Sequence, residues 1–207
     1  MRNIIIRKEE KSDFYQTESL VRNTFWNVYK PGCSEHYVLH LLRQNQDFVP
    51  ELDLVMECEG KIIGQIVFVK NAIKTSDGGN LPILSMGPLA IDKQFQRQGL
   101  GKKLLDFALE KATTLGYKAV CFEGDINFYG KSGFDLGCKK QIHYYAEDFN
   151  SDVPYFLVKE LKTGYFDGIE GVYTTPKVYF VDDKAVAEYD KNFPYLKKEK
   201  LATQIFS

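Results

Sequence analysis

One stretch in the middle of the chain constrains the fold most, because three kinds of structure follow one another there without a gap. An apolar run ends at Ile91, a polar loop with basic residues follows, and a helical pattern begins at Gly99. Gly116 stands where a left-handed helix cap is expected. These residues predict a strand, a loop and a long helix over 99–115. The apolar residues expected on its buried face are Leu100, Leu104, Phe107, Ala108, Ala112 and Leu115.

The junction between this loop and the helix has the chemistry of an anion site. The first turn of a helix presents unbonded backbone N–H groups and a partial positive charge, which suit a phosphate. Gly99 and Gly101 allow close approach of the backbone, because they have no Cβ. The alternative is an ordinary strand–loop–helix junction. Residues 92–103 hold one acid and four cations, which are Lys93, Arg97, Lys102 and Lys103.

The remaining pattern predicts an α+β domain with a mixed sheet and helices packed against it. The expected order is β-αα-βββ-α-β-α-β-β over residues 1–161. Beyond residue 161 the pattern is broken by glycines, so we expect a C-terminal extension, 162–207, packed on or beside the domain. It would hold a strand near 177–181 and a short helix near 184–190. The expected strands are 3–7, 52–58, 61–70, 83–91, 119–123, 141–147 and 155–161.

Composition and charge exclude several classes of protein. The 207 residues are 44% hydrophobic and 14% aromatic, which is typical of a folded chain with a core. A net charge of −1 argues against nucleic-acid or anionic membrane partners. No apolar run approaches the roughly 18 residues of a membrane span. The four cysteines form no C-x-x-C pair, which favours reduced thiols and a cytoplasmic protein.

Two motifs resemble those of one enzyme family. Gln96-x-x-Gly99-x-Gly101 is similar to the Q/R-x-x-G-x-G/A motif of the GNAT superfamily of acyl-CoA-dependent N-acyltransferases, and it has the same setting before a long helix. Further on, the segment 127–134 (N-F-Y-G-K-S-G-F) is similar to that family's tyrosine shortly before a Gly-Phe pair. The segment 124–129 (G-D-I-N-F-Y) resembles the G-D-x-x-[FY]-Y sequence of one branch. The resemblance covers residues 3 to about 161 and implies the GNAT fold, with a central, mostly antiparallel mixed sheet.

The resemblance also implies a site for acetyl-CoA and no metal. The backbone of residues 89–91 would pair with the pantetheine arm, the amides of residues 97–102 would hold the pyrophosphate, and Gln96 would brace the loop. The residues expected to contact the cofactor are Leu89, Ala90, Ile91, Gln96, Arg97, Gln98, Gly99, Leu100, Gly101, Lys102 and Asn127.

The same resemblance places Tyr129 beside the thioester sulfur, where it would protonate the departing CoA thiolate. Acyl transfer from a thioester needs positioning, an oxyanion donor and proton transfer. Because an amine attacks only when neutral, a base is also needed, and Glu123 at a strand end is the first candidate, with Asp125 the second. The alternative readings are a solvated carboxylate for Glu123 and a core side chain for Tyr129.

The expected function is therefore transfer of an acetyl group from acetyl-CoA to a primary amine by direct attack in a ternary complex. The acceptor would be a small molecule or a protein amine, and a homodimer is compatible with the edge strands of this architecture. The alternative is a non-catalytic domain of the same fold that binds or senses acyl-CoA. Consumption of the thioester with a panel of amines discriminates between the two.

Two further patterns have weaker support. The segment 124–132 resembles a Walker A loop, but five residues separate its glycines where that motif has four. Cys33, His36 and His40 have helical spacing for zinc ligands, but nothing in the sequence supplies a fourth ligand, so packing is the favoured interpretation.

Overall fold

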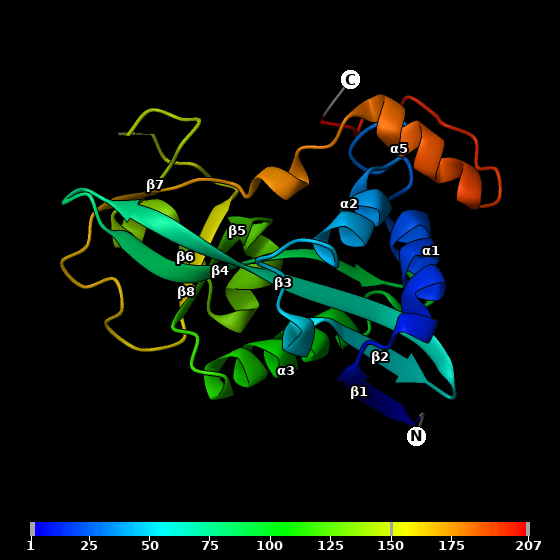
Figure 1. Ribbon diagram of the computed structural model, residues 1–207, viewed down its shortest axis with the longest axis horizontal. Helices are drawn as coiled ribbons and strands as arrows, with labels where there is room; N and C mark the ends of the chain where they lie inside the picture. Colours follow the sequence, from blue (N-terminus) through cyan, green and yellow to red (C-terminus); the bar gives the residue numbers. More distant parts are fainter. Residues whose placement is uncertain (1–2, 150, 206–207) are drawn as a thin grey trace. The chain divides into compact units, whose positions relative to one another are not determined.

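The structure, a computed structural model, describes residues 3–149 and 151–205 (Figure 1). The chain forms two compact units. Unit 1 is made of residues 1–67, 88–104 and 177–207, and unit 2 of residues 68–87 and 105–176. No helix in the described part of the chain has the length and apolar character needed to cross a membrane.

The order of helices and strands follows the expected one as far as α4, and two short strands, β6 and β9, were not expected (Figure 1). The helices are α1 (Phe14–Phe25), α2 (Glu35–Leu42), α3 (Leu100–Thr114), α4 (Ile126–Tyr129) and α5 (Asp183–Tyr189). The strands are β1 (Ile4–Lys8), β2 (Leu54–Cys58), β3 (Lys61–Thr75), β4 (Asn80–Ile91), β5 (Ala119–Glu123), β6 (Asp135–Leu136), β7 (Ile142–Tyr144), β8 (Phe156–Glu160) and β9 (Gly171–Tyr173).

The sheet of unit 1 is antiparallel. β1 pairs with β2 from Ile4↔Cys58 onward, and β2 pairs with β3 across a tight turn. The end of β4 continues the sheet, since the Asp92 N–H donates to the Ile63 carbonyl at 2.8 Å. Leu20 of α1 packs in a buried cluster with one side chain each from β2 and β3, so α1 covers this sheet.

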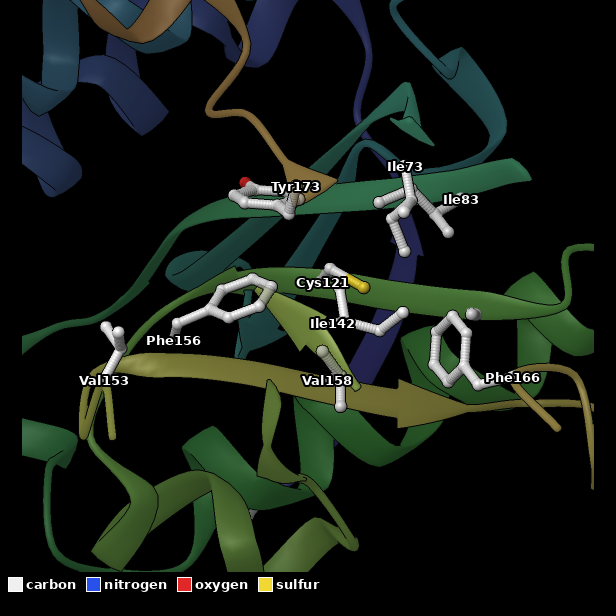
Figure 2. Close-up of a cluster of buried hydrophobic side chains, with 10 residues drawn as sticks. Ile73, Ile83, Cys121, Ile142, Val153, Phe156, Val158, Phe166 and Tyr173 are labelled. Carbon is white, nitrogen blue, oxygen red and sulfur yellow. The ribbon is translucent and has the colours of Figure 1, made fainter. Parts of the chain in front are cut away.

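The sheet of unit 2 is mixed. β5 pairs in parallel with β4 at Leu84↔Val120 and antiparallel with β8, which also pairs with β6. β9 pairs antiparallel with β3 and in parallel with β7. The expected α+β class with a mostly antiparallel mixed sheet and flanking helices is therefore confirmed. Figure 2 shows the core cluster of this unit, which consists of Ile73, Ile83, Ala119, Cys121, Ile142, Val153, Phe156, Val158, Phe166 and Tyr173.

Helix α3 buries a stripe that differs from the predicted one: Leu100 is only half-buried, and Leu105 and Leu109 are buried although they were not predicted to be. Phe107 is 40% exposed and Leu115 is 44% exposed. At 100° per residue Phe107 falls outside the buried stripe, and Leu115 lies one residue beyond the end of the helix. The buried residues of α3 are Leu104, Leu105, Ala108, Leu109 and Ala112.

The C-terminal part of the chain corrects two further expectations. The strand expected at 177–181 is wrong: a 3₁₀ turn, Lys177–Tyr179, closes with a hydrogen bond from the Phe180 N–H to the Lys177 carbonyl. It leads directly into α5, whose first turn is capped by the Asp182 carboxylate. The strand expected at 141–147 is shorter, because β7 ends at Tyr144. Residues 162–176 supply β9 to unit 2, and α5 belongs to unit 1.

A buried ionic network lies under α1 in unit 1. The Arg43 guanidinium donates to both oxygens of Glu9 (3.0 and 2.8 Å) and to Glu18 Oε1 (2.6 Å). Its Nε also lies 3.6 Å from Asp53 Oδ2. The side chains of these residues are at most 6% exposed. Three carboxyl groups therefore surround one cation out of contact with water.

The three residues considered as zinc ligands make separate contacts in unit 1. Cys33 Sγ lies 3.4 Å from His36 Nδ1, and His36 Nε2 lies 3.4 Å from Asp190 Oδ1. His40 instead lies 3.1 Å from Glu18 Oε1. Among the residues that the structure describes, no group of three or more His, Cys, Asp or Glu side chains is arranged to hold a metal ion.

The network predicts that stability falls as the pH rises between the unfolded and folded pKa values of Glu9, from about 4.5 to about 9. Burial, together with the neighbouring Asp53, raises the pKa of Glu9 from 4.5 to about 9. In this range the folded protein keeps a proton that the unfolded chain has lost, so the free energy of unfolding decreases with pH, by at most ~1.4 kcal/mol per unit from this group. Urea unfolding at constant ionic strength measures the slope. Glu9→Gln should flatten it, and a flat wild-type curve would contradict the prediction.

Candidate active site

The loop after β4 is held by side chains at its beginning. The Asp92 carboxylate accepts hydrogen bonds from the Gln94 N–H (3.0 Å) and from Lys61 Nζ (2.9 Å). Although partial burial opposes it, these donors hold the pKa of Asp92 below its ordinary value. Gln96 Nε2 donates to the Ile91 carbonyl at 2.9 Å, which ties the loop to the last residue of β4. The loop therefore leaves the strand in a defined direction.

The backbone of this loop turns sharply into α3. Arg97 has a φ of 58° and Gly99 a φ of 78°, both in the left-handed region. A left-handed non-glycine residue is uncommon and costs energy, so Arg97 is held there by the surrounding loop. The Lys103 N–H donates to the Gly99 carbonyl, so the first turn of α3 begins directly behind the exposed segment 96–99. This arrangement presents helix N-terminal amides, flanked by basic side chains, at the protein surface.

The end of β4 carries the residues expected to pair with pantetheine. Gly87 has a φ of 131°, a conformation that favours glycine, and Pro88 has no N–H to donate to a neighbouring strand, although β4 continues to Ile91. Leu89 is half-buried, whereas Ala90 and Ile91 are buried. The Ile91 carbonyl already accepts the hydrogen bond from Gln96, so a pairing of pantetheine with this segment stays a prediction.

Tyr129 lies at the end of the one-turn helix α4 in unit 2. Its half-buried ring packs edge-on against Phe122 at 4.6 Å and Phe128 at 4.8 Å between ring centroids. A Cβ at position 124 would lie 2.6 Å from a carbon of this ring, so Gly124 is required for the ring to occupy its place. In this chain the glycine of the G-D-x-x-[FY]-Y sequence is therefore needed to make room for the ring of its last tyrosine.

Asp125, the second candidate base, caps α4. Its Oδ1 accepts hydrogen bonds from the Asn127 backbone N–H and from Asn127 Nδ2, both at 2.9 Å. These contacts occupy both groups: the carboxylate satisfies the first turn of the helix, and the exposed Asn127 amide is turned toward it. Asp125 therefore has a structural role that explains its place in the sequence.

Glu123, the first candidate base, ends β5 and pairs with Phe156 across the sheet. The residue is half-buried, and its Oε1 accepts a hydrogen bond from Thr175 Oγ1. Thr175 Oγ1 in turn lies 3.1 Å from the Tyr144 hydroxyl. Sequence reasoning missed Thr175, which lies in the predicted extension, because the pairing of β9 with β7 and β3 brings it to this carboxylate.

The candidate residues fall into two groups, one in each unit. The segment 89–102 belongs to unit 1, and its cofactor candidates follow one another along β4, the loop and α3. Glu123, Asn127 and Tyr129 belong to unit 2, at the end of β5 and on α4.

Comparison with known proteins agrees with the motifs. The sequence model of the acetyltransferase (GNAT) domain family matches residues 51–136. The uncharacterized N-acetyltransferase YhbS of Escherichia coli strain K12 is 31% identical over 140 residues, covering 67% of this chain and 78% of the relative. The N-alpha-acetyltransferase 30 of Dictyostelium discoideum is 28% identical over 138 residues, covering 64% of this chain and 71% of that protein.

Solved structures give the same result. A crystal structure of the GNAT family N-acetyltransferase YhbS from E. coli in complex with CoA has a TM-score of 0.73 at 25% identity, covering 86% of this chain and 93% of that one. A GNAT family acetyltransferase from Brucella melitensis in complex with acetyl-CoA, at 21% identity and a TM-score of 0.68, covers 87% of this chain and all of that one, which shows the shared fold. The chain therefore belongs to the GNAT superfamily and is an acetyl-CoA-dependent acyltransferase.

Proposed function

We propose that this protein is an N-acetyltransferase that transfers the acetyl group of acetyl-CoA directly to a primary amine in a ternary complex. The observation that carries the proposal is the loop of residues 96–99, tied to Ile91 by Gln96 and turned through left-handed Arg97 and Gly99 into the first turn of α3. An exposed helix N-terminus with basic neighbours is the kind of donor set that a pyrophosphate needs. The CoA complex of the E. coli relative supports the same ligand.

In the proposed complex, the loop and strand bind the donor through the main chain. Amides of residues 97–102 hold the pyrophosphate, and main-chain groups of residues 89–91 pair with the pantetheine arm. Acetyl-CoA supplies an acyl group that is already activated as a thioester. The protein therefore has to orient the two substrates and move two protons.

Glu123 and Tyr129 move these protons in the proposal. Glu123 takes a proton from the acceptor ammonium, and the freed lone pair of the amine forms the new N–C bond. The C–S bond breaks, Tyr129 gives its phenolic proton to the departing thiolate, and the surplus proton on the new amide nitrogen restores the Tyr129 hydroxyl. Glu123 is preferred to Asp125 because the latter caps α4. The half-buried Glu123 carboxylate has a hydroxyl donor that fixes it.

Release of free CoA in the presence of amines tests the function. A suitable panel holds lysine, spermidine, an aminoglycoside and a peptide with a free α-amine, which covers small-molecule and protein acceptors. Mass spectrometry should detect the acetylated amine for at least one of them. If CoA binds but no amine is acetylated, and if Tyr129→Phe does not change the rate at which the thioester is consumed, the protein is a binding or sensing domain instead.

Tyr129→Phe should lower kcat by about 10²-fold and leave CoA binding unchanged, because it removes one proton donor and keeps the ring packing on Phe122. Steady-state kinetics measure the turnover, and calorimetry measures CoA binding. Tyr165→Phe is the matched control, since that hydroxyl donates to the Pro82 carbonyl in the same unit. A Tyr129→Phe enzyme with wild-type kcat would remove the acid role.

A further inference from the structure

We propose that Thr175 and Tyr144 are positioning residues for the base Glu123. Their two hydroxyl groups form a line of hydrogen bonds that ends on one oxygen of the Glu123 carboxylate, so that the other oxygen is left for the acceptor amine. The inference rests on the proposed role of Glu123 and adds two residues that no sequence motif marks. It also assigns a catalytic purpose to the segment that follows β9.

The hydrogen-bond chemistry sets the direction of this line. A hydroxyl group has a single proton, and an ionised carboxylate only accepts. Thr175 Oγ1 therefore gives its proton to Glu123 Oε1, and its lone pairs face the Tyr144 hydroxyl, which lies 3.1 Å away and donates. The order of donation is Tyr144 to Thr175 to Glu123, so each group in the line has a defined orientation.

Backbone pairing holds Thr175 in place. It follows β9 by two residues, and β9 is paired with β7 at Tyr144↔Tyr173. Asn71 Nδ2 of β3 donates to the Thr174 carbonyl at 3.0 Å, which fixes the chain one residue before Thr175. Thr175 itself is 8% exposed, so its hydroxyl is kept from bulk water.

Ring packing holds Tyr144. Its ring lies 5.6 Å from that of Phe156 and 6.1 Å from that of Tyr173 between centroids, and the last two rings stack at 4.8 Å. Figure 2 shows Phe156 and Tyr173 in the core of this unit. Phe156 is also the register partner of Glu123 across the sheet, so the residue that packs against Tyr144 lies on the strand beside the proposed base.

Three titratable groups around Glu123 have a raised pKa, because they are buried or hydrogen-bonded. Burial raises the pKa of Tyr144 above its ordinary range. Burial also raises the pKa of Cys121, which lies on β5 with Glu123, well above 9.0. Tyr155 donates to Glu147 at 2.7 Å, and that hydrogen bond, with burial, raises the pKa of Tyr155 to about 12. Tyr145 completes the aromatic border, with its ring 5.1 Å from that of Tyr144.

The matched pair Thr175→Val and Thr175→Ser tests the inference. Valine keeps the shape of the side chain without the hydroxyl, so kcat should fall roughly tenfold or more, because a misplaced base costs rate rather than binding of the donor. The KM for acetyl-CoA should not change. Serine restores the hydroxyl and should return kcat to within about threefold of wild type. Tyr144→Phe should lower kcat by a smaller factor than Thr175→Val.

Glu123→Gln separates a failure of this inference from a failure of the proposed function. With the panel amine that turns over fastest, the double variant Glu123→Gln/Thr175→Val should be no slower than Glu123→Gln alone, because Thr175 acts through the carboxylate. Full activity of Glu123→Gln would show that the proposed base is wrong. Three results would overturn the positioning role alone. The first is an inactive Glu123→Gln together with a fully active Thr175→Val, and the second is a Thr175→Ser that is as slow as Thr175→Val. The third is a double variant in which the two losses of kcat add. Thermal unfolding and calorimetry with CoA confirm that each variant is folded.

Discussion

Replacing Gly101 with tryptophan is expected to weaken CoA binding by about 10³-fold. Gly101 is the second residue of α3, in the turn whose amides are proposed to hold the pyrophosphate. A charge-assisted hydrogen bond contributes about 1.5–3 kcal/mol, and a large side chain here would block at least two of them. Calorimetry with CoA measures the loss directly, without knowledge of the acceptor.

Gly101→Ala is the matched control for this experiment. Alanine occurs at this position in the Q/R-x-x-G-x-G/A motif, and it favours the helix more than glycine does. This variant should bind CoA with nearly wild-type affinity. Retention of CoA binding by Gly101→Trp would show that the pyrophosphate lies elsewhere, even though the family of the chain is settled.

Arg43→Met is expected to destabilise the protein by about 3–5 kcal/mol. The substitution keeps a long apolar stem but removes the cation that Glu9, Glu18 and Asp53 share. Removal of one partner from a buried ionic network leaves the others without compensation, which costs more than the network contributes as a whole. Since a typical domain is stable by only about 5–15 kcal/mol, the midpoint of urea unfolding should move by a large fraction of its value.

Lys191→Met provides the comparison for Arg43→Met. Lys191 pairs with Glu188, and both side chains are at least 70% exposed. An exposed pair of this kind is worth at most about 1 kcal/mol, so this variant should unfold close to wild type. Equal effects of the two substitutions would mean that water reaches the buried network.

Local patterns were enough to predict the parts of this protein that depend on neighbours in sequence. The loop before α3 follows from glycine positions, basic residues and an apolar period, and the order of elements through α4 follows from the same reasoning. The short strands β6 and β9 were missed because two or three residues carry no period of their own. Their conformation comes from partners: Asp135 pairs with Val158, and Gly171 pairs with Thr75.

The same distinction divides the candidate site. Tyr129 and Glu123 stand next to a recognisable sequence, whereas Thr175 reaches Glu123 across 52 residues of chain. The buried network could not be predicted either, since Arg43 and Glu9 look like any pair of charged residues until β1, α1 and α2 are packed together. Side chains that act through long-range contacts therefore need the structure.

The pairing of Arg22 with Asp190 has a consequence for how the chain folds as it is made. Arg22 of α1 is 2% exposed, and its guanidinium donates to both oxygens of Asp190 at 2.6 and 3.1 Å. These residues are 168 positions apart. At ribosomal rates of about 5–20 residues per second, α1 emerges roughly ten to thirty seconds before its counter-ion. Burial of Arg22 beside its counter-ion must therefore wait for the segment that carries Asp190, so unit 1 cannot complete its folding before that segment has been made.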